Sequence, residues 1–390
     1  MMNKILAITP SVSVWTDGDS ILFDRKFYDG MLVYKSEWPG TISCIMNKSS
    51  GPLPSFGIVR KIISEIPFHL TILNKNEKIN YEHIKNASIV LASGDCFNKF
   101  HVSRLCKINK IKCVYTIEYI PETRYQIIDF EVKNPIIKFR KYIYIWNGER
   151  KRISAFKEAD GIQASGTAAY NEYHHLNNCI LYFDTRVDGG AMISHDQLED
   201  RLAKLTKNRQ LRLGFSGRLI RMKGADHLIK LAGLLKRRNI DFKMTIFGTG
   251  DLEAKMMDEI NDLKLNSQVS MPGAVDFYNE LLPEIKEHID LYVLLHRQSD
   301  PSCTYLETTS CGIPIVGYEN KAFSGLLQRA DVGWGKQIDD LTGIADAIEF
   351  LSKNKELIKE KSRNCITFSL AHDFKSTFQN RILHLRQLVE

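Results

Sequence analysis

The chain has 390 residues, of which 44% are hydrophobic and 25% are charged, and its formal net charge is +7. This length is enough for two domains with separate cores, and every apolar run falls short of the roughly 18 residues that span a bilayer. The eight cysteines are scattered without a Cys-x-x-Cys pair. This pattern excludes the common zinc-binding spacings and indicates reduced thiols in a cytoplasmic protein.

The first half of the chain alternates short apolar runs with segments of helical spacing. The earliest run, 4–9, is predicted to be a buried strand rather than a secretory signal, because Pro10 ends it and no small-residue cleavage site follows. Further strands are expected at 41–46, 68–73, 87–92, 112–117, 160–165 and 178–183, and helices at 21–34 and 102–109. Such alternation is typical of a parallel α/β sheet.

A polar stretch containing Gly189-Gly190 separates this series from a second one. In the second series, strands are expected at 211–215, 242–247, 268–271, 289–295 and 313–316, and helices at 226–237, 252–263 and 374–389. The predicted organisation is an N-terminal domain over 1–190, a linker over 191–208, a C-terminal domain over 209–371, and a C-terminal helix over 372–390 that can cross back to the first domain.

A strand–loop–helix–strand unit around Asp300 is the most informative stretch of the second half. Asp300 follows the strand 289–295, a helix is expected to begin near Ser302, and Glu307 lies about a turn and a half into that helix. Ligands bind at the carboxyl ends of parallel strands, and a helix N-terminus attracts phosphate. Two acids beside an anion site suit a ligand with a diphosphate and several hydroxyls, such as a nucleotide sugar. The alternative is that Asp300 caps the helix and Glu307 is a solvated acid.

Two more loops are expected at the same edge of this sheet. Gly217, Arg218 and Lys223 follow the first strand of the second series, where two cations can hold a diphosphate. Gly248 and Gly250 end the next strand and let a nucleotide approach the main chain. Each feature alone is explained as well by an ordinary turn, but the combination at one edge favours a nucleotide site.

The second half resembles the donor-binding domain of family 4 retaining glycosyltransferases, which have the GT-B fold of two Rossmann-like doubly wound α/β domains facing a cleft. The matching motifs, between residues 211 and 320, are Gly217-Arg-Leu, Lys223-Gly224, Phe247-Gly-Thr-Gly250, Asp300 through Glu307, and Cys311-Gly-Ile-Pro-Ile-Val316. The resemblance implies Arg218 and Lys223 on the diphosphate, Glu307 on the ribose, and Asp300 with its following backbone at the transferred sugar.

The resemblance gives two expected sets of site residues. The catalytic set is Arg218, Lys223, Asp300 and Glu118; the donor-binding set is Gly18, Gly217, Gly248, Gly250, Ser302, Cys303, Thr304, Tyr305 and Glu307. The family usually has two glutamates separated by seven residues, but here Ser299 occupies the first position and Asp300 is the nearest acid. Where the family often has a histidine, this chain has Glu118, which is expected to contact the donor sugar or the acceptor, or else to pair with Arg124.

No metal and no cofactor are expected. The segment Asp17-Gly-Asp19 imitates the metal-binding motif of the other glycosyltransferase fold, but a cap for a helix beginning at Ile21 explains these acids better. Gly18 lies in the loop that the family places near the donor. His296 has no ligand-like partner by spacing and is expected to be structural or exposed.

A basic region distinguishes the first half. Between Lys99 and Lys157 there are 14 Lys and Arg residues against 5 Asp and Glu residues. Within it, aromatic residues alternate with cations in a segment that resembles a membrane-surface element; its cations are Lys138, Arg140, Lys141, Arg150, Lys151 and Arg152. The alternative is a helix that buries its aromatic residues and exposes its cations. Nucleic acid is not expected, because no recognised module accompanies the charge.

The sequence and the resemblance therefore predict a retaining enzyme that moves a hexose from a nucleoside diphosphate sugar to a glycan or lipid-linked acceptor during cell-surface polysaccharide or glycolipid synthesis. The resemblance implies uridine as the base of the donor. It is expected in the cytoplasm, including the inner face of the membrane. One alternative is a nucleotide-sugar-binding protein without transfer activity. A dinucleotide-dependent dehydrogenase is disfavoured, because neither half has a Gly-x-Gly-x-x-Gly after its first strand.

Overall fold

The computed structural model describes residues 4–54, 57–207 and 210–390. The expected end of the linker at 208, the expected start of the second domain at 209, and residues 1–3 of the expected first domain lie outside these ranges. The chain divides into two compact units. Unit 1 comprises the residues up to Pro121, Phe139–Tyr182 and Lys375–Glu390, and unit 2 comprises Glu122–Lys138 and Phe183–Phe374.

Unit 1 is built on a seven-stranded parallel sheet with the strand order β10-β9-β8-β7-β1-β4-β6. Its strands are β1 (Ile5–Thr9), β4 (Thr41–Asn47), β6 (His69–Leu73), β7 (Ile89–Ser93), β8 (Lys112–Ile117), β9 (Gly161–Ser165) and β10 (Cys179–Tyr182). A second, three-stranded sheet holds β2 (Trp15–Asp17), β3 (Ser20–Asp24) and β5 (Ile58–Ile62). The central strands β7 and β9 are buried along their whole length, as expected for a parallel sheet with both faces covered.

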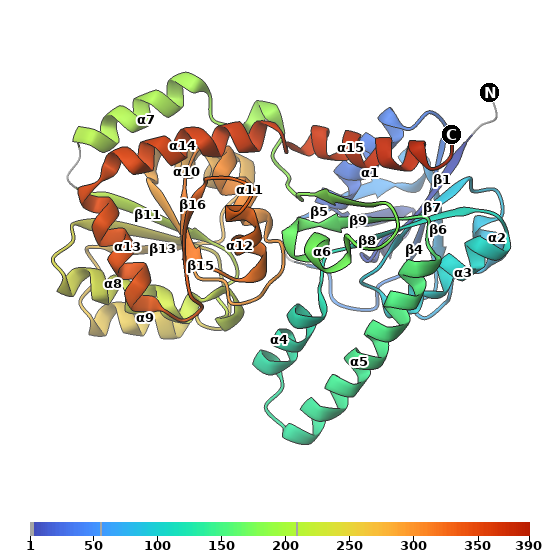
Figure 1. Ribbon diagram of the computed structural model, residues 1–390, viewed down its shortest axis with the longest axis horizontal. Helices are drawn as coiled ribbons and strands as arrows, with labels where there is room; N and C mark the ends of the chain where they lie inside the picture. Colours follow the sequence, from blue (N-terminus) through green and yellow to red (C-terminus); the bar gives the residue numbers. More distant parts are fainter. Residues whose placement is uncertain (1–3, 55–56, 208–209) are drawn as a thin grey trace. The chain divides into compact units, whose positions relative to one another are not determined.

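The helices that belong wholly or mainly to unit 1 are α1 (Arg25–Glu37), α2 (Tyr81–Ile84), α3 (His101–Ile108), α5 (Pro135–Glu158), α6 (Gly166–Tyr173) and α15 (Phe374–Gln387). The C-terminal helix α15 packs beside α1 (Figure 1). The ring centroids of Tyr34 and Phe378 lie 5.2 Å apart, and a Cβ atom on Gly30 would lie 2.6 Å from the Phe378 ring. The last segment of the chain therefore completes the core of unit 1.

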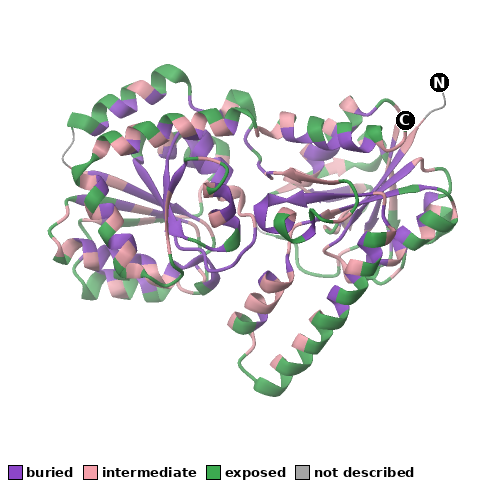
Figure 2. Ribbon diagram, viewed as in Figure 1, coloured by how far each residue is buried: buried purple, intermediate pink, exposed green. Residues whose placement is uncertain are grey.

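Unit 2 is a doubly wound domain on a six-stranded parallel sheet with the order β13-β12-β11-β14-β15-β16. Its strands are β11 (Leu211–Ser216), β12 (Phe242–Phe247), β13 (Val269–Gly273), β14 (Leu291–Leu294), β15 (Ile315–Tyr318) and β16 (Gly333–Lys336). Its helices are α4 (Pro121–Glu131), α7 (His195–Lys207), α8 (Ala225–Arg237), α9 (Glu253–Asp262), α10 (Leu282–His288), α11 (Cys303–Ser310), α12 (Lys321–Leu327), α13 (Leu341–Lys353) and α14 (Lys355–Leu370). Figure 2 shows the buried strands of this unit flanked by helices whose outer faces are exposed.

The expected helix over 21–34 is wrong at its start, because Ser20–Asp24 forms β3 and α1 begins one residue later. The apolar residues at the centre of this segment pack as a strand in the small sheet. Asp24 is the residue that caps α1, and its Oδ1 accepts a hydrogen bond from the Phe27 N–H at 2.9 Å. Asp17 instead forms an ion pair with Arg60 at 2.6 Å, so the expected capping role of Asp17 and Asp19 is wrong.

Most of the expected linker is a packed helix, α7, and not an open connection. Leu198, Leu202 and Leu205 are buried at helical spacing. The Arg201 guanidinium donates to the carbonyl oxygens of Cys311 at 2.7 Å and Gly312 at 2.6 Å, and burial lowers its pKa to about 10. The segment is rich in charged residues, so its sequence did not reveal the row of buried leucines that joins it to unit 2.

The segment in which aromatic residues alternate with cations, 138–152, lies in α5, and the first half of α5 is largely exposed. The exposed large side chains there are Ile136, Ile137, Phe139, Ile143, Tyr144 and Trp146. Arg152 does not belong with the surface cations: it is fully buried, pairs with Glu149, and donates to the Tyr119 carbonyl at 2.9 Å. Among the described residues, no helix combines the length and apolar character needed to cross a bilayer.

Candidate active site

The topology of unit 2 brings two of the expected loops together. When its six strands are numbered along the chain, the sheet has the order 3-2-1-4-5-6. In such a sheet the connections after the first and fourth strands leave in opposite directions. The point between these two strands is called the switch point, and ligands bind there. In unit 2 these strands are β11 and β14, which are neighbours. Lys223 follows β11 and Asp300 follows β14, and the Lys223 Nζ lies 3.6 Å from the Asp300 Oδ2. Both side chains are at least nine-tenths buried.

The loops after β11 and β12 are held against each other by backbone contacts that require glycine. The Gly217 N–H donates to the Phe247 carbonyl at 3.1 Å. Gly248 has a φ of +122°, and a Cβ atom there would lie 2.0 Å from the Gly217 oxygen. Arg218 is exposed beside this junction, as is Gly250. The two expected glycine loops therefore form one surface next to an exposed cation.

Lys223 is fixed by the short helical turn that carries it. Gly224 ends the turn in the left-handed conformation with a φ of +72°, and a Cβ atom there would lie 2.0 Å from the Leu295 carbonyl oxygen. Only glycine allows this close approach. The turn is therefore pressed against the end of β14, which sets the position of the Lys223 ammonium group.

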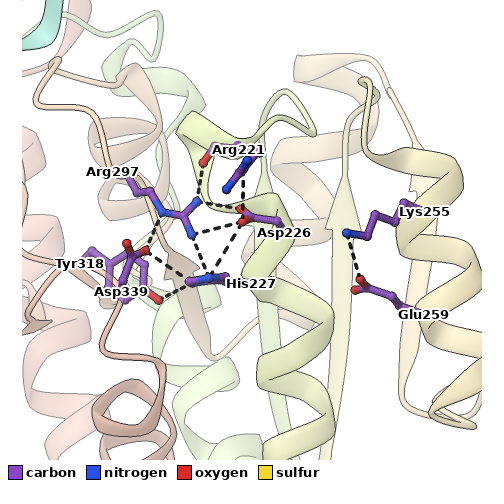
Figure 3. A network of polar contacts seen from close by, with 8 residues as sticks. All are labelled: Arg221, Asp226, His227, Lys255, Glu259, Arg297, Tyr318 and Asp339. Carbon is purple, nitrogen blue, oxygen red and sulfur yellow. Dashed lines mark hydrogen bonds and ion pairs between the residues drawn. The ribbon is translucent and has the colours of Figure 1, made fainter. Parts of the chain in front are cut away.

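A polar network around Arg297 ties the same turn to the loop after β14 (Figure 3). Arg297 donates to Asp226 Oδ1 at 2.7 Å, to Asp339 Oδ1 at 2.6 Å and to the Arg221 carbonyl at 2.6 Å. Its terminal nitrogen lies 2.9 Å from His227 Nε2. Burial, and then the charge of Arg297, lowers the pKa of His227. A neutral imidazole can accept from Arg297, so the network is consistent with an uncharged His227.

Within the described ranges, three buried side chains at the carboxyl end of β14 keep polar atoms without a hydrogen-bond partner. These atoms are both ring nitrogens of His296, Oε1 of Gln298 and Oδ1 of Asp300. Burial, with the neighbouring charge of Lys223, holds the pKa of His296 well below its usual range. A buried polar group without a partner costs about 1–3 kcal/mol. These groups therefore fit a polar ligand that would supply the missing partners.

The helix α11 begins beside this cluster. Ser302 is its N-cap residue, and the Ser302 hydroxyl donates to Thr304 Oγ1 at 3.2 Å. Cys303 lies 3.7 Å from Asp184 Oδ2 through its sulfur. The buried Tyr305 packs against His296 with ring centroids 6.0 Å apart. The four expected donor-binding residues 302–305 therefore form the first turn of a helix, whose N–H groups and dipole favour an anion.

Glu307 lies on the same helix and is 6% exposed. Its Oε1 forms an ion pair with the Arg186 Nε at 2.8 Å, and the Arg186 guanidinium stacks over the Phe277 ring at 4.8 Å. Burial alone would lower the pKa of Arg186, but neighbouring groups, first among them the Glu307 carboxylate, raise this pKa above its usual value. The alternative of a solvated Glu307 is therefore wrong, and so is the alternative of Asp300 as the helix cap, a position that Ser302 holds.

The two expected site residues of the N-terminal half lie in unit 1. Gly18 is exposed in the turn of the β2–β3 hairpin, with a φ of +55°. Glu118 follows β8, and its backbone N–H donates to Asp95 Oδ2 at 3.0 Å. The Tyr119 N–H donates to the other oxygen of Asp95 at 3.0 Å. Asp95 thus fixes the backbone that carries Glu118, and the roles of Gly18 and Glu118 stay predictions.

Sequence reasoning did not identify Gln298, Arg186 and Asn320, and it expected His296 to be structural or exposed; His296 is buried, so the exposed alternative is wrong. Asn320 donates to the His296 carbonyl at 3.0 Å and to the Tyr305 hydroxyl at 3.1 Å, and its Oδ1 caps α12. A histidine two residues after a buried strand, in the loop that carries Asp300, was the available signal for His296. Asn320 follows the last motif by four residues but belongs to none of them, and Arg186 lies well before the first motif, so only the fold brings these two residues to the site.

These features define the class of protein: two Rossmann-like parallel α/β units in one chain make the GT-B fold. Solved structures agree. An Anabaena protein, HepE, in complex with UDP matches with a TM-score of 0.68 at 12% identity, over 98% of this chain and 99% of that one. A glycosyltransferase from Rickettsia africae matches with a TM-score of 0.65 at 13% identity, over 100% of this chain and 99% of that one.

Residues 196–368 match the family model for glycosyl transferases group 1. One curated relative is the N-acetyl-alpha-D-glucosaminyl L-malate synthase of Bacillus anthracis, 28% identical over 118 residues. Another is the amylovoran biosynthesis glycosyltransferase AmsK of Erwinia amylovora, 26% identical over 157 residues. The matched parts make up 30% of this chain and of the first relative, and 37% of this chain and of the second.

The site residues also bear on metal binding. In the part of the chain that the structure describes, no group of three or more His, Cys, Asp or Glu side chains has an arrangement that could hold a metal ion. Asp17, one of the two acids of the Asp-Gly-Asp segment, is engaged by Arg60. Independence from a metal stays a prediction, tested below.

Proposed function

We propose that the chain is a retaining glycosyltransferase that moves a hexose from a UDP-sugar to a glycan or lipid-linked acceptor. The observation that carries this proposal is the cluster of buried polar atoms of His296, Gln298 and Asp300 that have no partner among the described residues. The cluster lies beside Lys223, at the switch point of the unit whose residues 196–368 match the family model for glycosyl transferases group 1. A sugar offers several hydroxyls and a diphosphate offers anionic oxygens, so one ligand would satisfy all of these groups.

The proposed roles follow from charge and position. Lys223, Arg218 and the first turn of α11 bind the diphosphate, because they supply two cations and a set of helix N–H groups. Asp300 and His296 contact the hydroxyls of the transferred sugar. Glu307, oriented by Arg186 at 2.8 Å, accepts from the ribose hydroxyls. Gly217 and Gly248 allow the nucleotide to approach the main chain.

In the proposed reaction, the bond between the anomeric carbon and the diphosphate oxygen breaks, and its electron pair stays on the departing diphosphate. Negative charge therefore grows where Lys223 and Arg218 lie. Cations and dipoles that are already in place stabilise such developing charge without reorganisation. The acceptor hydroxyl oxygen then bonds to the anomeric carbon, and its proton passes to the departing diphosphate. Glu118 in unit 1 is proposed to contact the acceptor or the donor sugar.

Uridine diphosphate as the leaving group is supported by relatives. Solved structures of HepE, the Anabaena protein with the same fold, contain UDP and UDP-glucose. The Erwinia relative is named for amylovoran biosynthesis. These names support a role in polysaccharide or glycolipid synthesis, with a glycan or lipid-linked acceptor.

We further propose that the exposed face of α5 binds an anionic membrane surface. Apolar and aromatic side chains there lie next to exposed cations, and Arg150 stacks on the Trp146 ring at 4.9 Å. This mixture suits the interface of a bilayer, where aromatic rings and cations meet lipid headgroups. The enzyme would then work in the cytoplasm at the inner face of the membrane.

A thermal-shift panel of UDP, GDP, ADP and CMP tests the nucleotide first, because a ligand that binds only the folded protein raises the melting temperature. UDP is expected to give the largest shift. Product analysis with UDP-hexoses and glycan acceptors then separates transfer from binding alone. A protein that binds UDP-hexoses tightly but never releases UDP from them would be a nucleotide-sugar-binding protein, the alternative left open by Ser299 and by the absence of the usual histidine from the sequence.

A further inference from the structure

A helix from the first half of the sequence holds the loop that carries Asp300. The chain enters α4 directly from unit 1, yet from Glu122 onwards this helix belongs to unit 2. Two of its side chains take up both hydrogen-bond donors of Ser299. The Ser299 N–H donates to Gln126 Oε1 at 3.0 Å, and the Ser299 hydroxyl donates to Glu122 Oε1 at 3.0 Å.

The two α4 side chains also support each other. Gln126 Nε2 donates to Glu122 Oε1 at 3.2 Å, which fixes the amide so that its oxygen faces Ser299. The other carboxylate oxygen of Glu122 pairs with Lys321, the first residue of α12. The Lys321 N–H lies 3.4 Å from the Ser299 hydroxyl oxygen. Glu122 is thus bonded on both oxygens by groups of unit 2.

The position of Ser299 makes this contact relevant to the site. Ser299 is fully buried and directly precedes Asp300, whose Oδ2 faces Lys223 and whose Oδ1 has no partner among the described residues. A hydrogen bond to the backbone N–H of residue 299 restrains the dihedral angles that aim the next side chain. The Ser299 side chain is uncharged and cannot form an ion pair with Lys321. Glu122, which lies on α4, supplies the negative charge that pairs with Lys321.

We propose that Glu122 and Gln126 are positioning residues for the donor sugar: they anchor Ser299 and thereby aim Asp300 into the site. This inference rests on the proposed function, since it takes Asp300 as the contact to the transferred sugar. It assigns α4 a role in the specificity for the sugar and not in the binding of the nucleotide. A site anchored in this way keeps its geometry before the ligand arrives, which lowers the cost of binding.

The first test needs no ligand. Hydrogen–deuterium exchange of the amides in 296–302 should be faster in Glu122→Ala and in Gln126→Ala than in the wild type, while Glu131→Ala, which removes an exposed acid from the last turn of the same helix, should leave it unchanged. The double variant Glu122→Ala/Ser299→Glu places a carboxylate on the loop itself, within reach of Lys321, and should bring the exchange back towards the wild type. Unchanged exchange in both alanine variants would overturn the inference.

The second test separates positioning from general support of the fold. Glu122→Ala should weaken the binding of UDP-hexoses about tenfold and leave the binding of UDP within about twofold, because only the sugar needs Asp300. The double variant should recover most of that loss. Equal losses for UDP and UDP-hexoses would show a structural role and overturn the inference. If the wild type bound neither ligand, the proposed function would fail, and the exchange experiment would still decide whether α4 anchors the loop.

Discussion

In the proposed function, some residues of unit 2 bind the nucleotide and others bind the sugar. Glu307 is the residue assigned to the ribose. Glu307→Ala should weaken UDP binding tenfold or more, because a hydrogen bond to a charged group contributes about 1.5–3 kcal/mol. The melting temperature should stay close to that of the wild type. Glu259→Ala, which removes an acid of α9 that pairs with Lys255 at 3.8 Å, is the control. Titration of UDP into Glu307→Ala with wild-type affinity would refute the assignment.

His296 and His227 form a matched pair at the residue scale. Burial lowers the pKa of both. Both ring nitrogens of His296 lack partners among the residues that the structure describes, whereas His227 contacts Arg297 at 2.9 Å and the Tyr318 hydroxyl at 2.8 Å. His296→Leu should therefore keep or raise the melting temperature and weaken UDP-hexose binding, since a site poised for a ligand sacrifices stability. His227→Leu should lower the melting temperature. If His296→Leu destabilised the protein as much as His227→Leu, His296 would be structural.

At the scale of elements, the network around Arg297 joins the turn that carries Lys223 to the loop after β14. Arg297→Ala leaves the half-buried Asp226 without its main cation, and breaking a buried pair costs about 3–5 kcal/mol. We expect a large fall in the urea midpoint together with weaker UDP binding, because Lys223 loses its support. Arg238→Ala removes partly exposed ion pairs with Asp346 and Glu349 and serves as the control. A variant that kept wild-type stability would show that the network is unimportant.

The helix α5 carries the membrane prediction. Neutralising its exposed cations Arg140, Lys141, Arg150 and Lys151 should abolish sedimentation with anionic liposomes, since each cation near such a surface contributes on the order of 1 kcal/mol. Of the six cations expected from the sequence, Arg152 is left in place because it is buried, and Lys138 because it pairs with Asp129. Neutralising the same number of exposed lysines in unit 2, Lys204, Lys243, Lys255 and Lys264, should have little effect. Binding should fall as salt rises. A wild type that stayed in solution with liposomes at low salt would disprove the prediction.

The sequence predicted elements well where an apolar run had clear limits. The strand 242–247 was found with its exact bounds, and the helix expected near Ser302 begins at Cys303. It failed where local pattern and tertiary context disagree: 21–24 has apolar residues that fit a helix, but pairing with β5 makes them a strand. The polar composition of α7 likewise concealed Leu198, Leu202 and Leu205.

The site shows the same limit. The motif residues Lys223, Asp300 and Glu307 could be located from glycines, charges and their order in the chain. Their partners could not, because Arg186 and Glu122 reach Glu307 and Ser299 across 121 and 177 positions of sequence. Contacts of that kind depend on packing, which no local pattern records.

The whole molecule should respond to acid through its buried and half-buried histidines. Burial lowers the pKa of His227, His296, His372 and His384. The unfolded chain therefore takes up protons below about pH 6.5, while the folded chain still holds these rings neutral. The free energy of unfolding should decrease as the pH falls from about 7 to about 5.5, and these groups should contribute no change above neutrality. Urea denaturation across this range checks the slope; a constant midpoint would contradict it.

Metal dependence is also a property of the whole protein. Activity should persist in excess EDTA, because Lys223, Arg218 and the first turn of α11 can neutralise the diphosphate without an ion. Transfer assays with EDTA, and with Mg²⁺ or Mn²⁺ added back, measure this directly. Complete loss in EDTA that either metal restores would direct attention to Asp17 and Asp19.

The central claim is that the loops after β11 and β14 form the binding site for a nucleoside diphosphate sugar. Calorimetric titration of UDP-glucose and UDP-galactose into the wild type and into Lys223→Ala, in excess EDTA, tests it most directly. The account predicts that the wild type binds at least one of these UDP-hexoses and that Lys223→Ala, while still folded, binds it at least tenfold more weakly. Wild-type affinity in the variant, or no binding by the wild type, would contradict the account.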